Sequence, residues 1–146
     1  MRGPALIRPR LPARHRAWIV AKTSVAIWLL AYAIATPPAT TALLGAFLWV
    51  WVSVAVTGLA VSVAGMFVAL RPARAKTGRM VELGGLLIAM AGPLIHAITL
   101  GGIMLPLFVD GADWTGRLGP LLQSLAIAAL LRVRYVEVRD RIGGAL

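Results

Sequence analysis

Cysteine is absent from the 146 residues of this chain, and only five residues are acidic. Without cysteine there is no disulfide framework and no thiolate for metal binding or redox chemistry. The sequence also has no acid-rich or His-rich spacing typical of a metal site, no glycine loop between a strand and a helix, and no plausible Ser–His–acid set. We therefore expect a protein that is not an enzyme, has no catalytic residues and binds neither a metal nor a cofactor.

Apolar residues dominate what is present. Hydrophobic residues make up 60% of the chain and charged residues only 14%, and the mean hydropathy is +0.85. A soluble domain of this length has a core too small to hide such long apolar runs. The composition therefore predicts a membrane protein.

Four apolar runs are separated by charged or proline-rich breaks, and each approaches the roughly 18 to 20 residues that a helix needs to cross about 30 Å of hydrocarbon. The second and third runs are longer, which indicates tilt, interfacial ends or a break. We predict an all-α integral membrane bundle of four transmembrane helices, with a basic Pro-rich cytoplasmic arm before it and a basic cytoplasmic tail after it. The helices cover 17–35, 41–70, 80–109 and 114–131, the arm covers 1–16 and the tail 132–146.

Positive charge is distributed very unevenly around these runs. Only Arg117 lies in the break between the third and fourth runs. The other fourteen cations are Arg2, Arg8, Arg10, Arg14, Arg16 and Lys22 near the start, Arg71, Arg74, Lys76 and Arg79 in the middle break, and Arg132, Arg134, Arg139 and Arg141 in the tail. Because Lys and Arg in short flanking segments are retained in the cytoplasm, both termini and the middle break are expected there. This predicts a multi-pass membrane protein.

The basic segments are expected to lie against anionic lipid headgroups. The residues proposed for this anchoring are Arg71, Arg74, Lys76, Arg79, Arg132 and Arg134. For the middle break, a role in setting the topology alone is favoured over a dedicated binding role. Nucleic acid is not an expected partner, because the cations are spread over three segments along one leaflet and no binding motif accompanies them.

The first apolar run has a second interpretation. Basic residues, an apolar stretch and then "AIA" at 33–35 resemble a secretory signal with a small-x-small cleavage site. Cleavage there would leave three crossings and an outside N-terminus. The uncut chain satisfies the charge rule with paired helices, and Trp28 and Tyr32 are typical of an anchor.

Small residues recur at helical spacing inside the runs and would let helix backbones approach one another. Such pairs favour a compact bundle and also occur at oligomer interfaces. The pairs are Gly58 with Ser62, Gly85 with Ala89, Ala97 with Gly101, and Ser124 with Ala128. Trp49 and Trp51 fit either the outer membrane edge or the interior of the bundle.

The third run carries polar chemistry at its centre. Pro93 cannot donate to the carbonyl of Ala89, so a kink is expected there that exposes a backbone acceptor near His96. A neutral His96 could hydrogen-bond across the bundle to Thr, Ser, Tyr32 or Gln123. The alternative is a proton-linked role in which protonation of His96 moves the kinked helix.

Glu82 lies near the cytoplasmic end of the same run. An ionisable side chain within a membrane is costly and points to a function. Glu82 is expected to pair at the interface with Arg79 or Lys76. His96, Pro93 and Glu82 are therefore the candidate gating residues.

A small, Cys-free chain rich in Ala, Gly and Arg, with four crossings, inside termini and the basic tail "RVRYVEVRDRIGGAL", resembles the four-helix holin-like membrane proteins of phages that infect actinobacteria. Holins accumulate in the host inner membrane, associate laterally and open lesions through which an endolysin reaches the cell wall. The resemblance implies a homo-oligomer that permeabilises the membrane. Two other functions fit the residues: an accessory or structural subunit of a larger membrane complex, and a small transporter or channel using His96 and Pro93.

Overall fold

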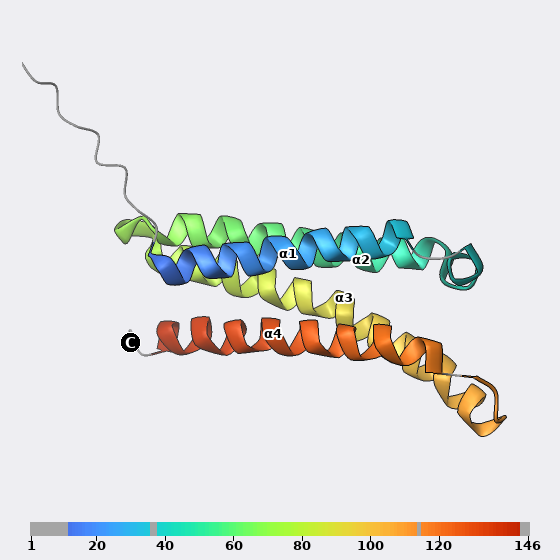
Figure 1. The fold of residues 1–146 in the computed structure, drawn as a ribbon. Helices are drawn as coiled ribbons and strands as arrows, with labels where there is room; N and C mark the ends of the chain where they lie inside the picture. The colour runs from blue at the N-terminus through green and yellow to red at the C-terminus, as the bar shows by residue number, and fades with distance from the viewer. Residues whose placement is uncertain (1–11, 36–37, 114, 144–146) are drawn as a thin grey trace, which may run out of the picture.

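The protein folds into four long helices joined by short connections, as Figure 1 shows for the computed structural model. The structure describes residues 12–35, 38–113 and 115–143, and for residues 38–46 it describes the backbone alone. No strand occurs in these residues. The helices are α1 (Ala13–Ala35), α2 (Pro38–Ala69), α3 (Ala75–Val109) and α4 (Leu118–Gly143), with short 3-10 turns η1 (Pro72–Arg74) and η2 (Thr115–Arg117) before α3 and α4.

Three of the helical segments are long and apolar enough to cross a membrane. They are Ala13–Ala35, Phe47–Ala69 and Pro72–Val109. The segment that contains α4 does not reach this standard, because its second half is rich in arginine. The expected all-helical membrane class is thereby confirmed, with three candidate spans.

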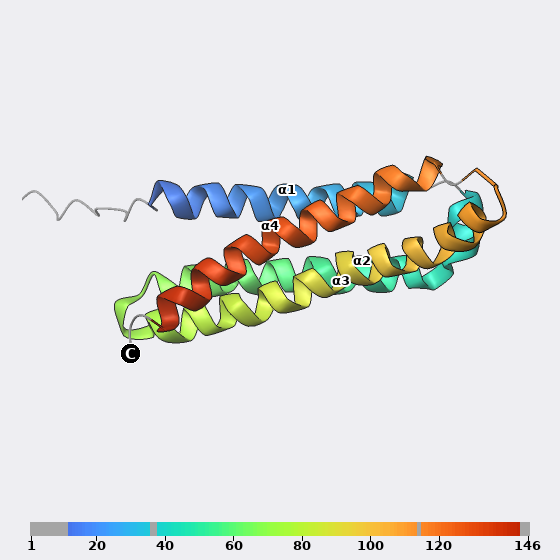
Figure 2. The same ribbon diagram turned by 90° about the horizontal axis from the view of Figure 1, so that it is seen from below.

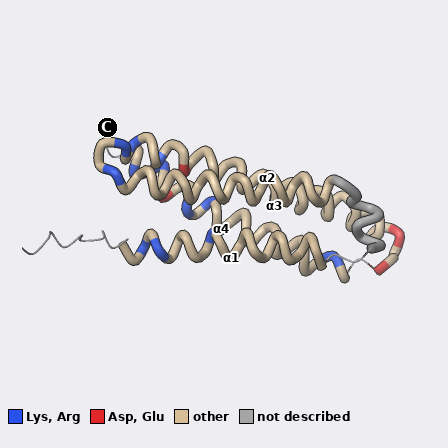
Figure 3. The backbone as a smooth tube through the Cα atoms, turned by 90° about the horizontal axis from the view of Figure 1, so that it is seen from above, with Lys and Arg blue, Asp and Glu red and all other residues tan. Residues whose placement is uncertain are grey.

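The helices form a bundle of two layers. α2 and α3 are antiparallel and pack closely between Gly78 and Gly92 of α3, and α1 packs on α2 while α4 packs on α3. Figure 2 shows α1 and α4 above the pair formed by α2 and α3, with α4 crossing at an angle. The start of α1, the α2–α3 connection and the end of α4 lie at one end of the bundle, which is also where most Lys and Arg residues gather (Figure 3).

Glycines create the close contact between α2 and α3. A Cβ atom added at Gly58, Gly65, Gly78, Gly85 or Gly92 would come within 3.0 Å of backbone or Cβ atoms on the facing helix, closer than real Cβ atoms approach. Gly58 faces Ala89, and Gly85 faces Ser62. The predicted pairs Gly58 with Ser62 and Gly85 with Ala89 therefore do bring the two backbones together, as small residues do in membrane bundles.

Gly101 does not play the packing role expected of it. Nothing lies within 4 Å of a Cβ atom placed at Gly101 or at Gly102. α3 diverges from α2 over its second half (Figure 1), and its second half instead follows α4. Ala97, Ser124 and Ala128 are buried, so the other predicted members of this group do lie inside the bundle.

The helices are longer than the apolar runs that predict them. α1 begins at Ala13, so the last part of the expected arm is helical, whereas residues 1–11 of that arm lie outside the described residues. α2 begins at Pro38 and not at residue 41, because proline is tolerated in the first helical turn. α3 already begins at Ala75.

The expected end of the fourth helix at residue 131 is wrong, because α4 continues to Gly143. Arginine is a good helix former. Glu137 pairs with Arg134 three residues before it and with Arg141 four residues after it, which are spacings that stabilise a helix. The basic tail is therefore a helical extension whose inner face packs against α3.

Neighbouring glycines of α3 allow a matched test of the α2–α3 contact. Gly85→Ala should destabilise the bundle by about 1 to 3 kcal/mol, because the new methyl group overlaps the backbone of α2 at Ser62 and Gly58. Gly84→Ala should leave stability unchanged or raise it by up to about 1 kcal/mol, since nothing lies within 4 Å there and alanine favours helix. Thermal unfolding in detergent measures both variants, and equal losses would contradict this packing.

Candidate functional site

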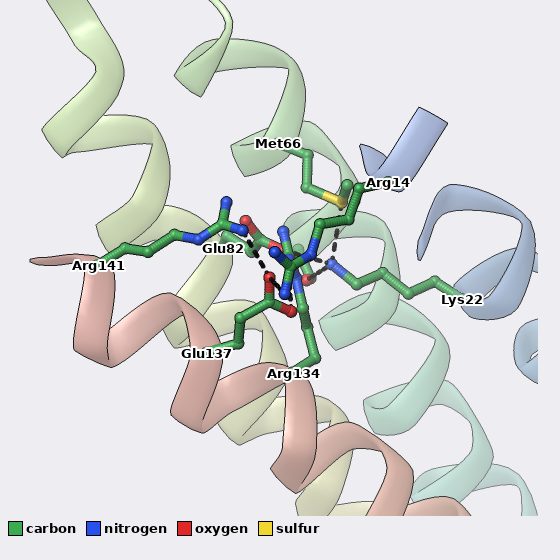
Figure 4. A network of polar contacts seen from close by, with 8 residues as sticks. Arg14, Lys22, Met66, Glu82, Arg134, Glu137 and Arg141 are labelled. Carbon is green, nitrogen blue, oxygen red and sulfur yellow. Dashed lines mark hydrogen bonds and ion pairs between the residues drawn. The ribbon is translucent and has the colours of Figure 1, made fainter. Parts of the chain in front are cut away.

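A buried charge network joins three helices near the cation-rich end of the bundle. Lys22 on α1 donates from Nζ to Oε1 of Glu82 on α3 over 2.8 Å. Nε of Arg134 on α4 donates to the same oxygen over 2.9 Å. Figure 4 shows these side chains converging between the helices. One carboxylate oxygen thus serves two cations from different helices.

The remaining helix supplies uncharged acceptors. Lys22 Nζ also donates to Oγ of Ser62 over 2.7 Å and lies 3.1 Å from Sδ of Met66, both on α2. The ammonium group has three protons, so Glu82, Ser62 and Met66 together provide an acceptor for each of them. All four helices therefore contribute to the charge network, which we define as Lys22, Ser62, Met66, Glu82 and Arg134.

Glu137 connects the charge network to the surface. Its Oε2 accepts from Nη1 of Arg134 over 3.0 Å, and its Oε1 pairs with Arg141 and with Arg14. Partial burial raises the pKa of Glu137, but the hydrogen bond and charge of Arg134 and the charges of Arg14 and Arg141 outweigh this and hold it below its ordinary value. Arg134 and Lys22 share the carboxylate of Glu82, and Glu137 gives Arg134 a second carboxylate.

The ionic groups of the network are almost fully removed from solvent. Lys22 is 1% exposed, and Glu82 and Arg134 are each 2% exposed. The guanidinium carbon of Arg134 also lies 5.3 Å from the ring centroid of Trp18, within range of a cation–π contact. Burying charges costs several kcal/mol per ion, which only well-placed opposite charges and hydrogen bonds offset. Removal of the Glu82 carboxylate therefore leaves the ammonium group of Lys22 without the charge that compensates it.

The predicted partners of Glu82 are wrong. Arg79 was expected to pair with it, but Arg79 donates to the carbonyl oxygen of Arg141, and Lys76 is exposed. Glu82 lies on the glycine face of α3, where a Cβ atom at Gly65 of α2 would touch its backbone. This face points into the bundle, so cations from other helices reach Glu82 and those of its own connection do not.

Arg134 was expected to anchor the tail on lipid headgroups, and the structure buries it instead. The buried residues of α4 recur every three or four positions, which is the period of one helix face. Because the helix continues beyond residue 131, Arg134 falls on that face. The other proposed anchors keep their accessibility: Arg71, Arg74, Lys76 and Arg132 are exposed and Arg79 is half-buried.

Lys22 is the member that the sequence interpretation missed, because it was grouped with the cations of the basic arm. Two features of the sequence indicate its role. It follows Arg16 by six residues within the first apolar run, and Glu82 is the one acid in the apolar part of the third run. Pairing with each other is the arrangement that most reduces the free-energy cost of placing a lone cation and a lone acid in two membrane helices.

A second polar layer lies deeper in the bundle, around His96. The His96 ring stacks on Trp51 of α2 with centroids 4.4 Å apart and meets Tyr32 of α1 edge-on at 5.6 Å. Its Nδ1 lies 2.8 Å from Oγ of Ser124 on α4. The predicted hydrogen bond to a serine across the bundle is confirmed, and Trp51 packs in the interior. Gln123, another predicted partner, lies on the exposed face of α4.

The tautomer of His96 is coupled to the serine hydroxyl. Oγ of Ser124 also lies 2.9 Å from the carbonyl oxygen of Pro120 and can donate its single proton there or to Nδ1 of His96. Within the described residues, His96 Nε2 and the indole nitrogen of Trp51 have no hydrogen-bond partner.

Pro93 does not divide α3, which is one continuous helix through Pro93 and Pro106. Pro93 is buried one turn before His96, and the bend of α3 away from α2 is visible in Figure 1. The side chain of His96 bonds to Ser124 and not to a backbone acceptor of its own helix.

Comparison of the chain with protein-family models, with curated proteins and with solved structures finds no match. Among the described residues, no three His, Asp or Glu side chains are grouped so that they could hold a metal ion. The charge network and the His96 layer are accordingly the features from which a function can be argued.

Glu82 should be the most sensitive position of the charge network. Among the described residues, Glu82→Gln removes the only carboxylate that Lys22 contacts and one of two that Arg134 contacts, so it should cost about 3 to 5 kcal/mol of stability. Lys22→Met should cost less, because Glu82 keeps Arg134. The double variant should be more stable than Glu82→Gln alone.

Asp140→Asn is the matched control for the loss of a carboxylate. Asp140 pairs with Arg139 at the surface, where both side chains are largely exposed, and such pairs contribute little. Thermal unfolding in detergent gives the order of all four variants. A loss for Asp140→Asn equal to that of Glu82→Gln would show that burial of the network is not what matters.

Proposed function

We propose that this chain is a non-enzymatic, multi-pass protein of the bacterial inner membrane that associates laterally and permeabilises the membrane in the manner of holins. The observation that carries this proposal is that Lys22, Glu82 and Arg134 point into the bundle. All four helices contribute to a charge network inside a bundle whose outer surface carries many large apolar side chains. Ionisable residues that face inward in a membrane bundle are typical of proteins that admit water or ions.

The charge network supports two states of such a protein. In the single bundle the charges neutralise one another, so the helices remain together in lipid. If copies gather and water enters between the helices, the same charges regain hydration and favour a wet lesion over a dry interior. A purely apolar bundle would have no such reason to tolerate water.

The outer surface of the bundle is largely apolar, which suits a protein that lies in lipid and can meet other copies there. Many large apolar side chains are exposed, among them Ile34 at 75% and Ile98 at 74%. Lipid tails cover such side chains as well as a protein does, so association has to come from close packing and polar contacts between copies.

We further propose that α4 crosses the membrane with the other helices and that both termini are cytoplasmic. Lys and Arg gather at the end of the bundle that holds the start of α1, the α2–α3 connection and the end of α4 (Figure 3). Asp110 and Asp113 lie at the other end, in the α3–α4 connection. The cation-rich end is retained in the cytoplasm by the positive-inside rule.

Reporter fusions test this orientation. A reporter that is active only outside the cytoplasm should be silent after Leu146 and within the segment from Arg71 to Arg79, and active between Asp110 and Arg117. The reverse pattern would overturn the topology. Cleavage after Ala35 would appear separately, as a mature chain lighter by its first helix.

Induced expression tests permeabilisation. Growth should continue for a period and then stop abruptly, and an added energy poison should advance that moment, because lesion formation by holins is coupled to collapse of the membrane potential. Membrane potential and dye entry measure the event. Unaltered growth at high levels of membrane-inserted protein would reject this function in favour of an accessory subunit.

A further inference from the structure

Gln123 is a polar side chain in an unusual place. It lies on the exposed face of α4, directly before Ser124, which points into the bundle. Within the described residues Gln123 makes no hydrogen bond, although its amide group offers two protons and a carbonyl oxygen. An exposed amide in water forms hydrogen bonds with the solvent. The depth of Gln123 in the membrane therefore decides whether its amide can find a hydrogen-bond partner.

The depth of Gln123 follows from the helix to which it belongs. It lies eleven residues before Arg134, so the rise of an α-helix places it about 16 Å further into the bundle than the charge network. Ser124 beside it bonds to His96 near the middle of α3, which is a candidate span. When α3 crosses the membrane, the Gln123 amide thus faces hydrocarbon, where lipid tails offer no hydrogen bond.

A groove lies beside this amide, between α1 and α4. It measures about 310 Å³ and is lined by Ser24, Val25 and Trp28 of α1 and by Gln123, Ala126 and Ile127 of α4. Figure 2 shows α1 and α4 crossing on the same side of the bundle. Ala126 is small, so a helix backbone can come close to α4 near Gln123.

We infer that a second copy of this chain docks along the α1–α4 groove and that Gln123 is its polar contact. A primary amide both donates and accepts, so two Gln123 side chains related by a two-fold axis satisfy each other with no other residue. The inference deepens the lateral association in the proposed function and rests on it for the insertion of α4. A lipid tail fills the same groove but leaves the amide unpaired.

The absence of cysteine makes this contact directly measurable. Full-length chains with Ala126→Cys, which keep the Gln123 amide, are expressed below the level that stops growth and treated with a mild oxidant in native membranes. A disulfide-linked dimer should form efficiently through residue 126. Ile98→Cys is the control, because Ile98 is 74% exposed on α3 and lies outside the groove. Equal or stronger cross-linking through residue 98 would overturn the inference.

The role of the amide is tested in the Ala126→Cys background. Gln123→Leu should lower the cross-linked fraction at limiting protein by about threefold to tenfold, the range expected for one interhelical hydrogen bond, whereas Gln123→Asn should retain most of it. No difference between the two variants would show that the amide does not hold the copies together.

The outcomes separate this inference from the proposed function. Permeabilisation with cross-linking only through residue 98 would overturn the groove and leave the function standing. Cross-linking through residue 126 without any growth arrest or dye entry would support the groove and reject permeabilisation. Cross-links from residue 126 only to a different membrane protein would overturn the second copy as the occupant.

Discussion

One carboxylate oxygen, Oε1 of Glu82, holds the ends of three helices in register. Lys22 and Arg134 approach it from α1 and α4, which otherwise pack mainly on α2 and α3 respectively. An ionic contact of this kind has a defined length and direction, whereas apolar side chains in lipid gain little by choosing one neighbour over another. The positions of α1 and α4 relative to each other therefore depend on this buried charge more than on apolar packing.

The carboxylate can occupy that position because α2 and α3 are exceptionally close. Glu82 sits between Gly78 and Gly85, and a Cβ atom at Gly65 would already contact its backbone. With glycine on both helices, the α2–α3 pair is thin enough for Lys22 to reach across from α1. The side chain of Ser62, beside Gly85, completes the contact. The small residues thus have two effects. They allow α2 and α3 to pack closely, and they let cations from α1 and α4 reach Glu82.

The four helices and the hydrogen bonding of His96 could be predicted from the sequence, whereas the charge network around Glu82 could not. The helical runs could be predicted from hydropathy, and a hydrogen bond of His96 across the bundle could be predicted from the cost of an unpaired polar group, although the partner stayed open among Thr, Ser, Tyr32 and Gln123. Glu82 was assigned to cations of its own connection, since nothing in one sequence tells which face of a helix a neighbour covers. Arg134 was misplaced for a related reason: composition suggests a surface tail, whereas the three-to-four periodicity of α4 continues through the charges.

The separation of the charges along the chain bears on how the protein is made. Lys22 is synthesised 60 residues before Glu82, an interval of about 3 to 12 s at ordinary rates of translation. During that time the first helix carries an unneutralised ammonium group, which disfavours a settled position in the bilayer. Arg134 follows 52 residues after Glu82. In the topology proposed above, the first helix therefore meets its buried counter-charge only after the third helix has been synthesised.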